Sequence, residues 1–227
     1  MTRNPWLRLT LIALGTALAP LAQAYPDNVR YGYANCGSCH VSPTGGGLLT
    51  PYGRGASEEF LSTWTRQGEG QFLHGAVKTP DWLLAGGEVR ALGYQRDTKV
   101  YKSKGVIPMQ LQGDVGLTYG SLVTGVASAG VYNKSTQLQQ IYVLANAGDN
   151  FFARVGKFFP AFGINVPEHT VVTRRGLGFD QGQESLNAEL GATFEAGEVI
   201  VDAILKPAIG EISIWLLRIG GSSWRGR

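Results

Sequence analysis

The sequence predicts a mainly β protein in which an antiparallel sheet follows a small helical segment, and two observations carry this prediction. After Pro80 the hydrophobic pattern has a period of two, which is clearest over residues 109–119 and 187–195. Such alternation indicates strands with one apolar and one polar face. Most of these strands are separated by short polar or glycine-rich turns, as at Tyr119-Gly120-Ser121. Consecutive strands are therefore expected to pair in an up-and-down order.

Seven segments fit this pattern, and an eighth is counted if a nearly continuous apolar run is accepted as a strand. One connection is much longer than the others, because residues 160–184 form an extended loop. The predicted strands are residues 82–95, 109–119, 122–132, 137–147, 151–159, 187–195, 198–206 and, as the eighth, 211–219.

The direction of the apolar face separates two architectures. A soluble β domain keeps this face inside, whereas an outer-membrane β-barrel turns it towards lipid and lines its lumen with polar side chains. Strands of about ten residues are near the length that a tilted membrane strand requires. One long loop among tight turns is also typical of such barrels. The pattern therefore favours the outer-membrane β-barrel over the soluble domain.

The first 24 residues have the features of a secretory signal peptide. Arg3 and Arg8 lie at the start without an acidic residue, residues 9–21 are apolar, and Ala22-Gln23-Ala24 is a small-x-small cleavage site. The apolar run is too short to span a bilayer as a helix. We therefore expect export, with Tyr25 first in the mature chain. The formal net charge of +3 gives no basic face of the kind that binds nucleic acid.

Cys36-Gly37-Ser38-Cys39-His40 contains the only two cysteines of the chain. The spacing is typical of a c-type haem attachment site. Two residues between the thiols let both sulfurs reach the two vinyl groups on one edge of a haem, and the adjacent histidine can ligate the iron. The motif therefore predicts one covalent haem c, bound by Cys36 and Cys39, with His40 as the proximal iron ligand.

Two other uses of a Cys-x-x-Cys motif fit less well. A redox pair usually follows a strand in a thioredoxin-like pattern, and nothing before Cys36 predicts one. A structural zinc site needs four ligands, whereas outside the motif the chain offers only His74 and His169 as nitrogen ligands. Export agrees with haem attachment, which in bacteria takes place outside the cytoplasm.

The segment around the motif is expected to be small and helical. A helix is predicted over residues 57–67, because Ser57 is a good N-cap residue and acidic residues follow it in the first turn. For the distal iron position the candidates are His74, Met109 and His169. Met109 lies on a predicted strand and His169 on the long loop, so His74, which follows the helix, is the candidate distal ligand. An open iron site is the alternative.

A basic cluster accompanies the fifth predicted strand and the long loop. Its members could focus anions at a constriction, as charged rings do in pores. They could also be solvated charges with acidic partners at Glu168, Asp180 and Glu184, and this second interpretation is favoured. The cluster consists of Arg154, Lys157, Arg174 and Arg175.

Residues 152–163, FARVGKFFPAFG, resemble the strand-and-loop signature of the phosphate-selective porin family. In that family a basic strand runs into a Gly-Lys/Arg-Phe-x-x-Pro-Phe-Gly turn, and the following loop folds inward to narrow the pore. More broadly, a haem motif after a signal peptide and before a porin-like sheet resembles the fused cytochrome–porins of the outer membrane, as in iron-oxidising bacteria. These barrels have about twice as many strands, and they commonly end on an aromatic residue rather than on Arg227. A truncated barrel is therefore also expected.

The resulting expectation is a signal peptide at residues 1–24, a c-type haem-binding segment at 25–79 and a porin-like antiparallel β-barrel at 80–227. No nucleophile with its base and no paired carboxylates in a cleft are recognisable, so electron transfer is favoured over a substrate-converting enzyme. The resemblance implies a single-haem cytochrome that carries electrons at or across the outer membrane. Its partners would be a periplasmic electron carrier and an extracellular or periplasmic donor, with ferrous iron as one candidate. The alternatives are a porin-like channel with a haem plug or sensor, and a soluble periplasmic cytochrome with a β scaffold.

Overall fold

The computed structural model describes residues 35–61, 68, 70–98, 100–132, 135–162, 176–179, 182–194, 197–206 and 214–221. The predicted signal peptide lies outside these residues. All eight predicted strands are present. They are β1 (Leu83–Asp97), β2 (Lys102–Tyr119), β3 (Val123–Tyr132), β4 (Ser135–Ala147), β5 (Phe151–Phe158), β6 (Ser185–Phe194), β7 (Gly197–Lys206) and β8 (Ile214–Gly221).

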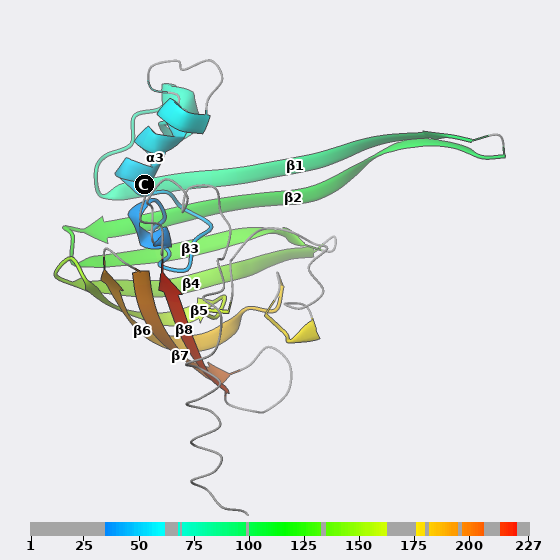
Figure 1. Ribbon diagram of the computed structural model, residues 1–227. Coiled ribbons are helices and arrows are strands. Elements are labelled where there is room, and N and C mark those ends of the chain that lie inside the picture. Colours follow the sequence, from blue (N-terminus) through cyan, green and yellow to red (C-terminus); the bar gives the residue numbers. More distant parts are fainter. Residues whose placement is uncertain are drawn as a thin grey trace, which may run out of the picture.

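The strands form one antiparallel sheet in the order β1 to β8 (Figure 1). Each strand pairs with its neighbour in the sequence, which confirms the mainly β, up-and-down topology. The sheet is open, because within the described residues β1 pairs only with β2 and β8 only with β7. Closure into a barrel would need ladder hydrogen bonds at these two edges, so the structure supports the sheet but not the closed barrel.

Strand β2 is longer than predicted. Its first residues, from Lys102 onwards, pair with the end of β1, although Gly105 and Pro108 interrupt the hydrophobic alternation there. Strand β3 joins β2 only from Leu111. The far half of the β1–β2 hairpin therefore extends beyond the rest of the sheet (Figure 1).

The apolar face of the sheet is the exposed one. On β2, Val115 and Leu117 are 48% and 54% exposed, whereas Gln110 and Asp114 on the opposite face are each 5% exposed. The same alternation continues across the other strands. Further exposed apolar side chains are Val123, Ile141, Val143, Phe151, Val155, Leu190, Val201 and Leu217. The packed interior therefore lies on the polar face of the strands, which we call the inner face.

The segment before the sheet contains only short helices among its described residues. They are the 3-10 helix η1 (Cys36–Ser38), α3 (Pro51–Ala56), the π-helical turn η2 (Ser57–Leu61) and the 3-10 helix η3 (Phe72–Gly75). The predicted start at Ser57 is wrong, because Thr50 caps the helix and proline occupies its first position. Residues 62–67 of the predicted helix lie outside the described part. None of the described helices is long and apolar enough to cross a membrane.

The sheet curves around this N-terminal segment (Figure 1). Val41 and Leu48 belong to the same buried apolar cluster as Leu84, on β1. The side chain of Leu48 packs against Gly116 on β2, where a Cβ atom would lie 2.9 Å from Leu48 Cδ1. The residues that follow the Cys-x-x-Cys-His motif therefore share one core with the inner face of the sheet.

Candidate functional site

The motif forms one short 3-10 turn. The Oδ1 atom of Asn35 caps it by accepting hydrogen bonds from the backbone N and the Oγ of Ser38, each at 2.9 Å. The backbone N–H groups of Cys39 and His40 donate to the carbonyl of Cys36 at 3.2 and 2.9 Å. The two cysteines thus lie within one turn, and no disulfide joins them. Burial raises the pKa of the Cys39 thiol.

After the motif the chain reverses in a glycine-rich loop. His40 and Leu49 form an antiparallel bridge, which closes the loop. Gly45, Gly46 and Gly47 have φ angles of 85°, 77° and 64°, a conformation that other residues rarely adopt. A Cβ atom at Gly45 would lie 3.4 Å from Cys36 Sγ. The three glycines therefore allow the loop to fold back against the first cysteine.

Helix α3 packs on the second cysteine. Thr50 Oγ1 accepts a hydrogen bond from Gly53 N and donates one to the carbonyl of Ser38, both at 3.0 Å. The backbone N of Thr50 also donates to the carbonyl of Cys39 at 2.9 Å. A Cβ atom at Gly53 would lie 2.1 Å from the same carbonyl oxygen. Only glycine at position 53 lets the first turn of α3 approach the motif this closely.

His40 has the properties of an imidazole that can ligate a metal. Burial lowers the pKa of His40, and a hydrogen bond with the backbone of Gly46 offsets part of this lowering. The Nδ1 atom is buried and has no hydrogen-bond partner among the described residues. Neutral imidazole is the form that binds metals, and a buried unpaired polar atom in a native structure needs an explanation such as a ligand. His40 could therefore hold an iron atom.

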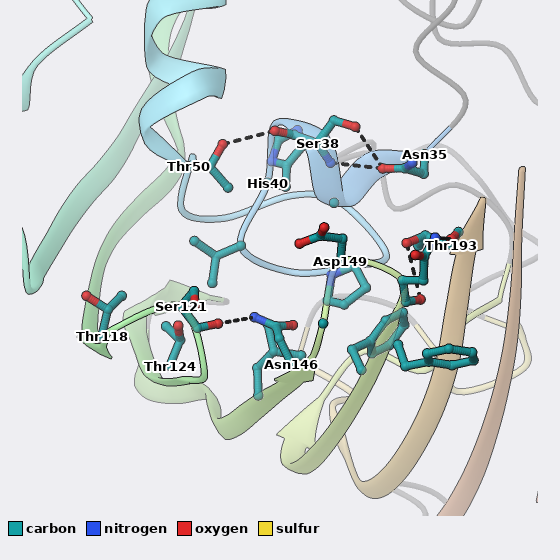
Figure 2. A pocket seen from close by; sticks show the side chains of 18 of the residues that line it. Asn35, Ser38, His40, Thr50, Thr118, Ser121, Thr124, Asn146, Asp149 and Thr193 are labelled. Carbon is teal, nitrogen blue, oxygen red and sulfur yellow. Dashed lines mark hydrogen bonds between the residues drawn. The ribbon is translucent and has the colours of Figure 1, made fainter. Parts of the chain in front are cut away.

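A cavity of about 540 Å³ lies between the motif and one end of the sheet (Figure 2). Gly37, Ser38 and His40 line it from the motif, whereas the thiols of Cys36 and Cys39 are not among its lining groups. The volume falls within the roughly 300–1,000 Å³ of small-molecule and cofactor pockets. From the sheet, the cavity is lined mainly by polar residues at the strand ends and turns, among them Thr118, Ser121, Thr124, Asn146, Asp149 and Thr193.

Arg154 of β5 reaches from the sheet into the loop that follows His40. Its Nη1 atom donates to Ser42 Oγ at 2.8 Å and its Nη2 atom to Thr44 Oγ1 at 3.3 Å. Nη2 also lies 2.9 Å from Glu189 Oε2, and Glu189 is the residue of β6 directly opposite Arg154. Arg154 and Glu189 are 2% and 1% exposed. The sheet and the motif segment are therefore joined by a buried charged group.

This position corrects one interpretation of the basic cluster. Arg154 is neither a solvated charge nor part of an open ring, because loop hydroxyls and Glu189 surround its guanidinium group. Lys157 does have the predicted partner, with Nζ 3.8 Å from Glu184 Oε2. Arg174 and Arg175 lie outside the described residues.

The candidate distal ligands do not line the cavity in the described structure. His74 lies on η3 with an exposed side chain. Met109 lies on the apolar face of β2 and is also exposed. His169 is outside the described residues. The assignment of His74 as the distal ligand therefore stays a prediction.

Sequence reasoning missed Ser42, Thr44 and Glu189. The sequence does indicate Glu189 as a partner for Arg154, because Glu189 lies on the polar face of a strand that is expected to pair with the strand of Arg154. No comparable signal exists for the two hydroxyl residues, since the contact with Ser42 spans 112 positions in the sequence.

Within the described residues, no group of three or more histidine, cysteine, aspartate or glutamate side chains could hold a metal ion. The candidate iron ligand is therefore a single histidine beside two thiols. No protein-family model, curated protein or solved structure matches this chain.

Proposed function

We propose that this chain is a single-haem c-type cytochrome that carries electrons at or across the outer membrane. The observation that carries the proposal is the turn in which two thiols are followed by a half-buried histidine whose buried Nδ1 atom has no hydrogen-bond partner among the described residues. Cys36 and Cys39 would bind the haem covalently and His40 would ligate its iron. Bound haem supplies a one-electron couple, whose potential depends on axial ligation, hydrogen bonding and burial.

The surroundings of the motif support this use of its residues. Thr50 and Gly53 hold the backbone at Cys39, and the glycine loop lies against Cys36. Burial lowers the pKa of His40, which favours the neutral imidazole that can donate a nitrogen lone pair. His40 lines a cavity of cofactor size, although the two thiols do not. His74 is the proposed distal ligand.

The exposed apolar face supports a location in the outer membrane. Contiguous apolar surface of this extent marks a site of membrane or protein interaction. Strands with apolar residues outside and polar residues inside are typical of outer-membrane barrels, whereas a sheet that faces water on one side has the opposite pattern. We therefore propose that β1 to β8 form the wall of a porin-like barrel. In lipid, the free edges of β1 and β8 must also find partners.

The position of the cavity supports a periplasmic partner. The cavity lies at the end of the sheet where short turns join β2 to β3 and β4 to β5. In outer-membrane barrels the short turns face the periplasm. A periplasmic electron carrier could therefore approach the site directly. The electron donor is extracellular or periplasmic, and ferrous iron is proposed on the resemblance alone.

A porin-like channel is the second candidate function. An open channel needs water along the inner face, but Arg154 is 2% exposed there, and Phe158 and Ile200 are fully buried. This packing favours electron transfer over ion conduction. A periplasmic cytochrome with a soluble β scaffold is disfavoured because the scaffold would expose its apolar face to water.

A covalent-haem stain and an absorption spectrum of the membrane fraction test the proposal. The Cys36→Ala, Cys39→Ala double variant should lose covalent haem. His40→Ala should keep it, with altered iron coordination. Met109→Leu serves as the control and should leave both signals unchanged. Full haem staining of the double variant would refute the cytochrome assignment.

A further inference from the structure

We propose that Arg154 of β5 is a positioning residue for the haem site, because it anchors the loop that holds Cys36 and His40 in place. This inference rests on the proposed function, and it names a residue in the sheet that acts on the motif through the chain between them. Arg154 connects the sheet to the motif in three steps, from the guanidinium group to the loop, from the loop to the motif, and from the sheet to the guanidinium group.

The first step is the contact between Arg154 and the loop. The guanidinium group donates to the hydroxyl oxygens of Ser42 and Thr44, at 2.8 and 3.3 Å. These two hydroxyl groups also lie 3.1 Å from each other. All three side chains are buried, and hydrogen bonds to a charged donor are stronger than neutral ones. Both residues lie within four positions of His40, so the loop is tethered close to the proposed iron ligand.

The second step is the contact between the loop and the motif. The backbone N of Gly45 donates to the carbonyl of Ser42 at 2.9 Å, which fixes the glycine turn relative to the tethered residues. Gly45 packs against Cys36, and the bridge between His40 and Leu49 closes the same loop at the histidine. A displacement of Ser42 and Thr44 would therefore move the groups that border the first cysteine and the histidine.

The third step is the rigidity of Arg154 itself. Its guanidinium carbon lies 3.8 Å from the ring centroid of Phe158 and 5.2 Å from that of Tyr142. Glu189 binds Nη2 from the neighbouring strand. The guanidinium group is thus held both by stacking on Phe158 and by the charge of Glu189. Lysine cannot reproduce this arrangement, because it lacks both the flat face and the fork of donors.

Cys39 provides an internal reference for this mechanism. Its backbone is held by Thr50 and by the close approach of Gly53, whereas the side-chain hydrogen bonds of Arg154 go to Ser42, Thr44 and Glu189. Loss of the Arg154 anchor should therefore loosen Cys36 and leave Cys39 nearly unchanged. A general loss of folding would expose both thiols.

The test uses the full chain prepared without haem and the full chain with haem. In the haem-free chain, the alkylation rate of each thiol by iodoacetamide is measured by mass spectrometry. The double variant Ser42→Ala, Thr44→Val removes the contacts from the loop side and keeps the buried Arg154–Glu189 pair intact. We expect Cys36 to react about tenfold faster or more, because the opening of this loop is opposed by charged hydrogen bonds. Arg154→Lys should act in the same direction.

In the haem-loaded chain, the same variants should shift the absorption spectrum and speed the binding of an added ligand such as cyanide. Lys157→Met is the matched control, since this residue lies on the same strand but binds the carbonyl of Leu138 and Glu184 instead. It should change neither measurement. Equal Cys36 reactivity in the variants and the unaltered chain would overturn the proposal. So would faster alkylation with unchanged ligand binding and spectrum, since Arg154 would then act on packing alone. If the unaltered chain carries no haem, the proposed function fails, and the alkylation rates still decide whether Arg154 anchors the loop.

Discussion

The two faces of the same strands have opposite chemistry and opposite environments. The inner face carries Arg154, Glu189, Asn187 and Asp202, which are buried, whereas the outer face carries leucine, valine and isoleucine side chains that protein atoms leave uncovered. A sheet that folds in water has the reverse arrangement, with its apolar face against the core. Packing within the chain therefore accounts for the polar inner face but not for the apolar outer face, which the proposed membrane location would explain.

The N-terminal segment stabilises the buried charged groups of the inner face. Buried charged groups are stable only when they are paired and hydrogen-bonded. Ser42 and Thr44 supply hydroxyl acceptors to Arg154, and Leu48 covers one glycine on each of β1 and β2. The N-terminal segment and the sheet therefore form one packed unit at the inner face.

The largest expected effect comes from removing a buried charge from the inner face. Glu189→Ala leaves the Arg154 guanidinium without its carboxylate, and breaking a buried ion pair costs about 3–5 kcal/mol of unfolding free energy. Leu190, the next residue on β6, is 66% exposed on the outer face. Leu190→Ala should cost about 1 kcal/mol, because few protein contacts are lost. Urea unfolding in detergent micelles, followed by tryptophan fluorescence, measures both. A larger loss of unfolding free energy for Leu190→Ala than for Glu189→Ala would contradict the conclusion that the inner-face network stabilises the fold.

A second prediction concerns charge on the outer face. Val115→Arg and Leu117→Arg should each destabilise the bilayer-inserted chain by about 2–4 kcal/mol if these residues lie near the bilayer midplane. Gln112→Arg is the control on the inner face, where the new side chain can bind Asp114 as Gln112 now does at 2.8 Å. Unfolding from lipid vesicles measures the difference between the two faces.

Chemical labelling shows whether lipid or a protein partner covers the outer face. Cysteines at positions 115 and 117, in a background without Cys36 and Cys39, should react with a membrane-dissolved reagent. If both positions are shielded from lipid-phase and water-soluble reagents, and the chain fractionates without detergent, another protein surface covers the outer face. The outer-membrane part of the proposed function would then be wrong.

Much of the fold could be predicted from local pattern. The alternation of Val115 and Leu117 with Gln112 and Asp114 identified β2 and its faces, and glycine at position 120 marked the turn to β3. The start of α3 was missed, because Ser57 is as good a cap in sequence as Thr50, and only packing on Cys39 distinguishes them.

Of the candidate site, only the contiguous motif could be recognised from the sequence, and its covalent attachment to haem stays a prediction. The motif at residues 36–40 is contiguous, so its spacing alone indicates the chemistry. The Arg154 anchor depends on residues from β5, β6 and the loop after His40, which only tertiary structure brings together. The open edges of the sheet likewise depend on long-range pairing, which local alternation does not determine.

A smaller effect is expected from filling the space above a glycine on each face. Gly116→Val places a side chain against Leu48 and Leu84 on the inner face, whereas Gly113→Val on the outer face of the same strand meets no atom within 4 Å. Overpacking of a core costs about 1–3 kcal/mol, whereas valine is a residue type enriched in strands and has open space at position 113. Only Gly116→Val should lower the unfolding free energy. Equal stability of the two variants would show that Leu48 does not occupy the inner face in solution.

The smallest effect is expected from the pH dependence of Glu184, directly before β6. Its buried carboxylate accepts a hydrogen bond from Gly182 N at 3.0 Å and lies 3.8 Å from Lys157 Nζ. Burial raises the pKa of Glu184 above its usual 4.5, although Gly182 and Lys157 counteract part of this effect. The folded chain therefore holds this proton more tightly than the unfolded chain does. The contribution of Glu184 to stability is complete below its usual pKa and is lost as the pH rises through the raised value. Glu184→Gln should remove this part of the pH profile. If the unaltered chain and Glu184→Gln show the same dependence of unfolding free energy on pH, water reaches this carboxylate. The buried part of the inner face would then begin further along β6.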